Sequence, residues 1–120
     1  MYYVLSVLKS GFNLLLIDAD IVLLRNPLNY IRNLNGFHEI DMFFSSDERS
    51  NKPETFDWIC AGFFYVKSNR KTIEFFTIVL REMDKSGSVD QDVIQWLLTG
   101  KVRKNVFINS ILGMEQKRNL

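Results

Sequence analysis

The chain has 120 residues, the length of one domain, and its 15 basic and 14 acidic side chains leave a net charge of +1. This balance gives no indication of a nucleic acid or an anionic membrane surface as a partner. Hydrophobic residues make up 47% of the sequence and 10 of them are Phe, which predicts a core rich in aromatic side chains. The single cysteine, Cys60, excludes an internal disulfide, and we interpret it as a small buried side chain. Neither a signal peptide nor an apolar run long enough to span a bilayer is visible.

The first third of the chain predicts a helix, a strand and a second helix. Residues 2–9 have a weak helical pattern, and Gly11 is well placed to end that helix. Residues 13–17 contain an unbroken apolar run after Asn13, which is typical of a strand buried in the middle of a sheet. Asn26 and Pro27 indicate the start of the second helix, because Asn caps free N–H groups and proline fits the first helical position.

The middle of the chain predicts two more strands. They are expected at residues 40–45 and 59–67, with a polar loop at residues 46–54 between them. Gly62 lies inside the second of these strands. A glycine at such a position often marks the close approach of a ligand or of another backbone segment. Its simpler interpretation is a β-bulge.

Two helices are expected after these strands. Asn69 predicts the cap of a long helix that ends at Gly87. Ser88 and Gln91 have the spacing of a capping box for the next helix, which Gly100 closes. An apolar stripe marks the buried face of the long helix, at Ile73, Phe76, Leu80 and Met83.

Strands and helices alternate along the whole chain, with a last strand expected at residues 102–108. This alternation predicts an α/β layer structure with a mostly parallel sheet flanked by helices, in a single domain over residues 1–120. Ligands bind such sheets at the carboxyl ends of the strands. The acidic pair Asp18 and Asp20 comes directly after the apolar run at residues 13–17, which is that kind of position.

The same two carboxylates predict a metal site. Buried like charges repel each other, and a divalent cation removes that cost. Hard cations such as Mg²⁺ and Mn²⁺ usually bind through a few carboxylates plus substrate phosphates. The metal then neutralises the charge of a diphosphate leaving group. Asp18 and Asp20 are therefore candidate metal ligands.

Other interpretations of the acidic pair remain open. A D-x-D sequence by itself is weak evidence for a metal site, and both residues could be solvated acids on a plain turn. Their place between two apolar runs, at residues 14–17 and 21–24, argues against idle solvated charges. Haloacid-dehalogenase-type phosphatases also begin with an apolar strand and D-x-D. They normally continue with small residues, whereas bulky apolar residues follow here.

Three blocks of sequence resemble the nucleotide-diphospho-sugar transferases. The first, residues 14–28, has the family's D-x-D, apolar run, basic residue and proline. The second, residues 60–69, resembles its glycine strand ending in a polar pair, and the third, residues 90–92, resembles its acidic-Gln motif at a helix start. Three blocks in the family's order are more specific than any one of them.

The resemblance implies a GT-A fold, which is a Rossmann-like α/β domain. It also implies a divalent metal, usually Mn²⁺, and a nucleotide-diphospho-sugar donor such as a UDP-sugar. By this similarity Asp18 and Asp20 match the metal and diphosphate site, with Asp20 favoured as the direct ligand. Ala61 and Gly62 match the place where backbone passes close to the donor sugar.

The third block matches the catalytic side of the family's site. Asp90 and Gln91 correspond to residues that face the sugar or the acceptor, and Asp92 is grouped with them. Lys9 lies where the family often has a basic residue before the D-x-D strand. The two acids also fit a purely structural role, because the helix dipole favours acidic residues in a first turn. Trp58 and Trp96 are interpreted as packing residues rather than as platforms for a sugar.

The chain departs from the family pattern in three respects. Cys60 stands where many members have Asn, so an expected amide is missing. The only histidine, His38, lies in a polar loop and is interpreted as a surface residue rather than a metal ligand. Only 17 residues precede the D-x-D, too few for the strands that bind the nucleotide base. The chain is therefore expected to be a partial domain, incomplete at the N-terminus.

Two hypotheses for the function follow. The first is a glycosyltransferase that moves a sugar to a glycan or glycoprotein acceptor. The resemblance places it in the Golgi lumen, with contact to the membrane only through an anchor that this sequence lacks. The alternative is a non-catalytic fragment or remnant of such a domain.

Overall fold

The computed structural model describes residues 1–46 and 58–100, which form a mixed helix and sheet structure. Its elements are α1 (Tyr2–Lys9), β1 (Leu14–Ile17), α2 (Pro27–Arg32), β2 (Met42–Ser46), β3 (Ile59–Val66), α3 (Arg70–Ser86) and α4 (Asp90–Thr99). All of these elements lie within one or two residues of their predicted places except α2, which ends at Arg32, before the pair Asn35 and Gly36 that the sequence suggests as its end. The predicted strand at residues 102–108 and nearly all of the loop at residues 46–54 lie outside the described residues.

The three strands form one sheet in the order β1-β3-β2, and both outer strands run antiparallel to β3. The prediction of a mostly parallel sheet is therefore wrong for the described part of the chain. The strands β1 and β2, which α2 connects in the sequence, do run in the same direction, as the alternation of strands and helices predicts. They are not neighbours in the sheet, however, because β3 lies between them and pairs with both.

The strand β1 lies at the edge of this sheet rather than in its middle. Its four residues pair with β3 on one side and are all half-buried. The central strand is β3, whose residues are mostly buried. The apolar run in β1 therefore correctly predicts a strand but wrongly predicts a central place for it within the described sheet.

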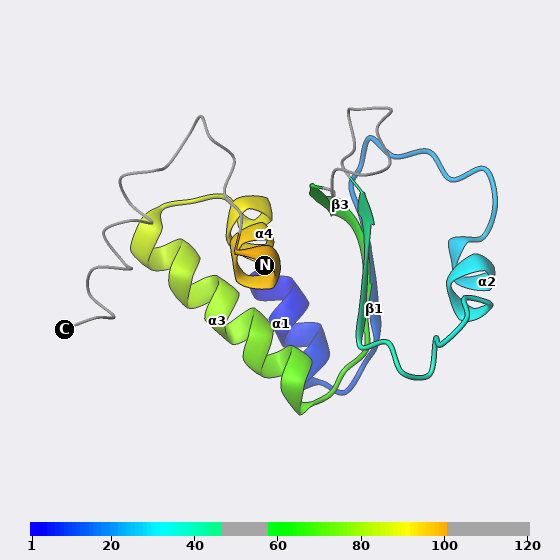
Figure 1. The fold of residues 1–120 in the computed structure, drawn as a ribbon, viewed down its shortest axis with the longest axis horizontal. Coiled ribbons are helices and arrows are strands. Elements are labelled where there is room, and N and C mark those ends of the chain that lie inside the picture. Colours follow the sequence, from blue (N-terminus) through cyan, green and yellow to red (C-terminus); the bar gives the residue numbers. More distant parts are fainter. Residues whose placement is uncertain (47–57, 101–120) are drawn as a thin grey trace.

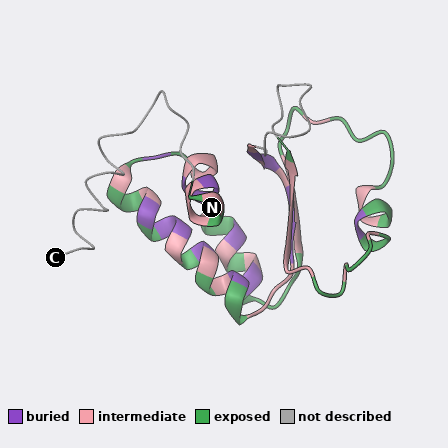
Figure 2. Ribbon diagram, in the orientation of Figure 1, coloured by how far each residue is buried: buried purple, intermediate pink, exposed green. Residues whose placement is uncertain are grey.

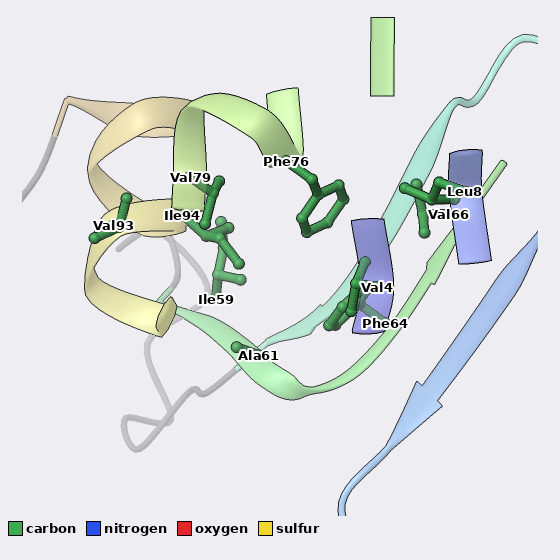
Figure 3. Close-up of a cluster of buried hydrophobic side chains, with 10 residues drawn as sticks. All are labelled: Val4, Leu8, Ile59, Ala61, Phe64, Val66, Phe76, Val79, Val93 and Ile94. Carbon is green, nitrogen blue, oxygen red and sulfur yellow. The ribbon is translucent and has the colours of Figure 1, made fainter. Parts of the chain in front are cut away.

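The core lies between the sheet and a layer of three helices. Figure 1 shows α1, α3 and α4 on one face of the sheet and α2 on the other. The buried residues gather between the helices and β3 (Figure 2). Phe76 of α3 stacks on Phe64 of β3, with ring centroids 5.8 Å apart. The core cluster in Figure 3 consists of Val4, Leu8, Ile59, Ala61, Phe64, Val66, Phe76, Val79, Val93 and Ile94.

Local capping fixes where α2 and α3 begin. The Asn26 side chain accepts a hydrogen bond from the Leu28 N–H at 3.0 Å. At the start of α3, the Asn69 side chain accepts from the Thr72 N–H at 3.0 Å, and the Thr72 hydroxyl accepts from the Asn69 N–H at 3.1 Å. This reciprocal pair is a capping box. Gly87, with φ of +65°, ends α3 as predicted.

The start of α4 differs from its prediction. The residue that caps α4 is Val89, and no side chain there accepts a capping hydrogen bond. The Ser88 hydroxyl is buried and has no hydrogen-bond partner among the described residues. The predicted capping box of Ser88 and Gln91 is therefore wrong, because the Gln91 side chain bonds to β3 instead. Gly100 does end the helix, with φ of +69°.

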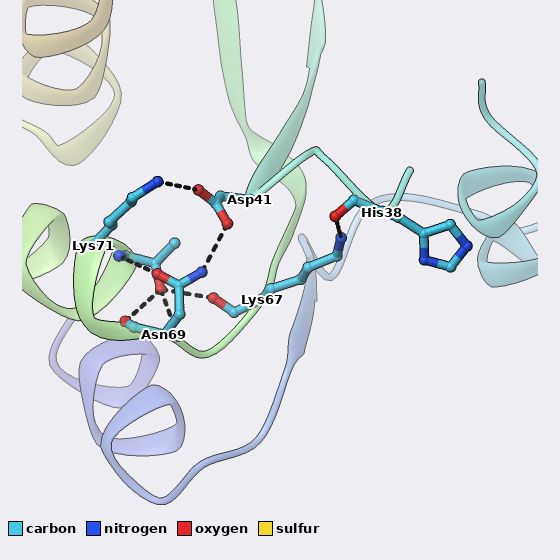
Figure 4. A network of polar contacts seen from close by, with 6 residues as sticks. His38, Asp41, Lys67, Asn69 and Lys71 are labelled. Carbon is cyan, nitrogen blue, oxygen red and sulfur yellow. Dashed lines mark hydrogen bonds and ion pairs between the residues drawn. The ribbon is translucent and has the colours of Figure 1, made fainter. Parts of the chain in front are cut away.

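A polar network ties the segment after α2 to the junction of β3 and α3 (Figure 4). The Lys67 N–H donates to the Asp41 carbonyl at 2.9 Å, and the Asn69 amide donates to the Asp41 carboxylate at 2.8 Å. The Lys67 ammonium donates to the carbonyls of Phe37 and His38 and lies 4.3 Å from the centre of the Phe37 ring. These contacts hold the α2 side of the molecule against the sheet.

Truncation of Phe76 tests the helix–sheet core. We expect Phe76→Ala to lower the free energy of unfolding by about 3–5 kcal/mol, because it empties a fully buried aromatic site. Urea denaturation followed by circular dichroism measures this value. Glu74→Ala, on the exposed side of the same helix, is the control and should change stability by less than about 0.5 kcal/mol. Equal effects of the two substitutions would contradict the described core.

Candidate functional site

The acidic pair Asp18 and Asp20 lies on a tight turn directly after β1. The Ile21 N–H donates to the Asp18 carbonyl at 3.1 Å, which closes the turn. Both acidic residues are exposed. The apolar run after them is exposed too, with Val22 at 81% and Leu24 at 92%. The interpretation that the two acids lie in apolar surroundings is therefore wrong in this structure, since water reaches both of them.

Gly62 of β3 gives Asp18 its place. The Asp18 N–H donates to the Gly62 carbonyl at 2.8 Å. A Cβ atom on Gly62 would lie 2.3 Å from Oδ2 of Asp18 and 2.9 Å from its Cγ, which is closer than such atoms approach. Only glycine leaves room for the carboxylate here. A close approach at Gly62 is therefore observed, but the group that approaches is the Asp18 side chain; the predicted approach of a donor sugar stays a prediction.

A break in strand register coincides with this glycine. Phe44 of β2 lies opposite Phe64 of β3, but Ser45 lies opposite Cys60, so residues 61–63 have no counterpart in β2. This break in the register agrees with the bulge interpretation of Gly62. A bulge at this point re-aims the backbone next to the acidic turn.

The first turn of α4 contacts the same part of β3. The Ala61 N–H donates to Oε1 of Gln91 at 3.2 Å. Because β1 ends at Ile17, which lies opposite Phe63, Ala61 has no partner in β1. A buried backbone N–H without a partner costs about 1–3 kcal/mol, so the Gln91 side chain supplies an acceptor that this strand needs.

A second glutamine extends this contact by one helical turn. Gln95 is 3% exposed, and its Oε1 accepts from the Ile59 N–H at 2.7 Å. Gln95 is not among the site residues predicted from the sequence. The spacing of Gln91 and Gln95 is the signal that could have found it, because residues four apart lie on the same face of a helix.

The two acids of the third block lie in the first turn of α4 and are half-buried. Oδ1 of Asp90 accepts from the Gln91 N–H at 2.7 Å. The helix dipole favours both acids at this position whether or not they take part in catalysis. The catalytic role of Asp90 and Asp92 therefore stays a prediction.

These contacts bring three of the sequence blocks to one place on β3. Asp18 comes from the first block, Ala61 and Gly62 from the second, and Gln91 from the third. The segments are far apart in the sequence, so only the fold unites them. The acidic turn and the start of α4 are therefore neighbours of the same strand.

Several other sequence-predicted residues lie elsewhere. Lys9 is in the last turn of α1, which precedes the start of β1, whereas the acidic turn follows the end of β1. His38 is exposed, as predicted. The polar pair that ends the second block has structural roles, because Asn69 caps α3 and the Ser68 hydroxyl donates to the Leu8 carbonyl at 2.6 Å.

The side chains present fit a metal only with help from a ligand. The described residues contain no group of three or more His, Cys, Asp or Glu side chains that could hold a metal ion. Mg²⁺ is nevertheless commonly bound through one or two carboxylates together with substrate phosphates. Asp18 and Asp20, exposed on one turn, match that requirement if phosphate oxygens complete the coordination.

A double-mutant cycle tests the contact of Gly62 with Asp18. Gly62→Ala should destabilise the chain by about 1 kcal/mol or more, because the new methyl group displaces the carboxylate. In an Asp18→Ala background the same substitution should be neutral or stabilising, since glycine disfavours a strand interior. Urea denaturation of all four chains gives the coupling energy. An equal effect in both backgrounds would show that the two residues do not touch.

Comparison with known proteins places the chain in a family. Residues 1–116 match the nucleotide-diphospho-sugar transferases. A UDP-galactose:fucoside alpha-3-galactosyltransferase of Dictyostelium discoideum is 37% identical over 79 residues, which are 60% of this chain and 11% of that protein. A beta-arabinofuranosyltransferase of Arabidopsis thaliana is 31% identical over 103 residues, which are 82% of this chain and 18% of that protein. No solved structure matches the chain.

A third relative has no assigned activity. It is an uncharacterized protein of Arabidopsis thaliana, 33% identical over 96 residues, which are 79% of this chain and 27% of that protein. The chain thus spans 11% to 27% of the length of the three relatives. The family match, however, covers nearly the whole chain and includes all three blocks that meet on β3. The chain belongs to the nucleotide-diphospho-sugar transferase family.

Proposed function

We propose that this chain carries the metal and diphosphate site of a glycosyltransferase. In this proposal the protein transfers a sugar from a nucleotide-diphosphate donor to a hydroxyl group of a glycan or glycoprotein acceptor. The observation that carries the proposal is the meeting of three segments at one place. The acidic turn, the glycine of β3 and the start of α4 are joined there by the contacts of Asp18 with Gly62 and of Gln91 with Ala61.

The acidic turn would hold the metal. The Asp18 backbone is fixed to β3, and the residue remains exposed, so its carboxylate is accessible to a ligand. Mn²⁺ or Mg²⁺ bound by Asp18 and Asp20 would supply positive charge against the departing diphosphate. Without a metal, the two carboxylates would repel the diphosphate, so donor binding is expected to require the cation.

The second and third blocks have separate roles in this proposal. Gly62 leaves space for the Asp18 carboxylate, so its first role is to position that acid. Its contact with the donor sugar, together with that of Ala61, follows from the family resemblance. Oε1 of Gln91 is already engaged by the Ala61 N–H. We therefore assign the chemical role on the sugar or acceptor side to Asp90 and Asp92, and a positioning role to Gln91.

The relatives support a transferase activity, although their names differ in the sugar. One is named for transfer of galactose from UDP-galactose to a fucoside, and another for transfer of arabinofuranose. Family membership supports a sugar nucleotide as the donor and the GT-A arrangement for the complete domain. It also removes the support for the phosphatase alternative.

The place of action stays a prediction. None of the helices in residues 1–46 and 58–100 is long and apolar enough to cross a membrane. The Golgi lumen and an anchor in the membrane follow from the family resemblance alone. Both concern the protein in its cellular setting rather than the chemistry of the site.

Calorimetric titration of UDP into the folded chain, with and without Mn²⁺, tests the proposed site. We expect saturable UDP binding that requires Mn²⁺. Asp18→Asn and Asp20→Asn should each weaken it at least about tenfold, the effect of losing one contact to a charged group. Glu74→Gln removes an equal charge from the exposed face of α3 and is the control. It should leave the affinity within about twofold, because solvent ions screen distant surface charges.

Each result has a direct meaning. Metal-dependent UDP binding that is lost in Asp20→Asn supports the transferase proposal. A folded chain that binds no UDP would mean that this segment by itself does not hold the donor, and it would favour the alternative of a non-catalytic fragment or remnant. Equal binding by the Asp20→Asn and unsubstituted chains would move the metal site away from the acidic turn.

A further inference from the structure

The two glutamines of α4 match the repeat of β3. Gln95 accepts from the Ile59 N–H, and Gln91 accepts from the Ala61 N–H. Four residues of an α-helix rise about 6 Å. Two residues of a strand advance about 6.7 Å. One turn of the helix therefore spans the distance between alternate N–H groups of the strand, and both amides can bond at once.

This pairing sets a direction. The later glutamine bonds to the earlier strand residue, so α4 runs antiparallel to β3 at the contact. One step beyond Gln91 towards the start of the helix is Asp90. One step beyond Ala61 along the strand is Gly62, whose carbonyl accepts from the Asp18 N–H. The register of α4 on β3 therefore holds the first turn of α4, which contains Asp90, next to the strand residue that precedes Gly62.

We propose that Gln95 is a positioning residue, which together with Gln91 sets the register of α4 on β3 and thereby holds the first turn of α4, with Asp90, against the strand next to Gly62. The register follows from the hydrogen bonds themselves. The importance of this register for the reaction rests on the proposed function, because Asp90 is a residue of the site only in that proposal.

The surroundings of Gln95 suit this role. Its side chain is almost fully buried, and its Nε2 donates to the Thr99 hydroxyl at 3.0 Å, which fixes the orientation of the amide. Oε1 then points to the Ile59 N–H. Ile59 lies beyond the end of β1 and is itself buried, so β1 supplies no acceptor for it. The bond is thus a tertiary contact that takes the place of β1 on one side of Ile59, while Ser46 of β2 lies opposite this residue on the other side.

Three substitutions separate the hydrogen bonds from the bulk of the side chains. Gln95→Met and Gln91→Met keep similar length but remove the strong acceptor. Gln91→Glu keeps a carboxylate oxygen as acceptor for Ala61. Leu98→Met, on the exposed side of the same helix, is the matched control. Circular dichroism checks the fold, and Gln91→Met at the half-buried position is the milder variant if Gln95→Met does not fold.

Amide hydrogen exchange measured by NMR tests the register. Gln95→Met should speed exchange of the Ile59 amide about tenfold, as expected for the loss of one buried hydrogen bond. Gln91→Met should do the same to the Ala61 amide, while Gln91→Glu and Leu98→Met should leave it protected. Unchanged exchange in both methionine variants at Gln91 and Gln95 would overturn the proposal.

Paramagnetic broadening by Mn²⁺ together with inorganic diphosphate, which completes the metal's coordination, tests the placement of Asp90. In the unsubstituted chain, metal bound at the acidic turn should broaden the amide signals of both Gly62 and Asp90. In Gln95→Met the broadening at Asp90 should fall at least about twofold while that at Gly62 persists, because Gly62 stays bonded to Asp18. Equal broadening of Asp90 in both chains would overturn the positioning role.

The two readouts also separate this proposal from the proposed function. If Mn²⁺ with diphosphate broadens no signal in the unsubstituted chain, the metal site of the proposed function fails. In that case the exchange rates of the Ile59 and Ala61 amides still decide the register. Altered exchange would then support the helix-to-strand register, and unchanged exchange would overturn it.

Discussion

The structure depends on how β3 finds hydrogen-bond partners beyond the end of β1. The central strand is twice as long as this neighbour, and a buried N–H group cannot be left without an acceptor. The Asp18 N–H continues the pairing by one residue at Gly62. Side-chain amides of α4 then replace the missing strand at Ala61 and Ile59. Satisfying this one strand brings the acidic turn and the start of α4 to the same place.

The lack of a side chain at Gly62 leaves room for the Asp18 carboxylate next to β3. At Gly62 the strand bulges, and the empty Cβ position is taken by the Asp18 carboxylate. A residue with a side chain would force this acid away from β3. The acid is therefore held without being buried, so it avoids the cost of a desolvated charge and remains open to a cation. An exposed pair of carboxylates on a fixed turn suits a metal that shares its coordination with phosphate groups.

The rest of the fold makes β3 a rigid support. Phe64 stacks between Phe44 of the neighbouring strand and Phe76 of α3, at centroid distances of 5.1 and 5.8 Å. At the far end of the strand, the Ser68 hydroxyl fastens the junction to α1, and Asn69 caps α3. Close packing of this kind resists small displacements, so a contact made at one end of β3 keeps its geometry.

The sequence by itself determined what local interactions control. The helix starts at Asn26 and Asn69 and the helix end at Gly87 are predicted correctly, because each depends on bonds within a few residues. The close approach at Gly62 is visible for a similar reason, since a glycine inside an apolar strand usually marks a bulge or a nearby group. The order of the three blocks is sufficient to indicate the family.

Only the tertiary structure decided which strands pair and what the polar side chains contact. The spacing of Gln91 predicts a local cap, but its acceptor oxygen bonds to a strand residue 30 positions earlier, and Gln95 bonds 36 positions earlier. The central place of β3, the antiparallel pairing and the exposure of Asp18 depend on the same long-range packing. A sequence pattern reports local preference, whereas these features are set by which distant groups compete for each N–H and each buried surface.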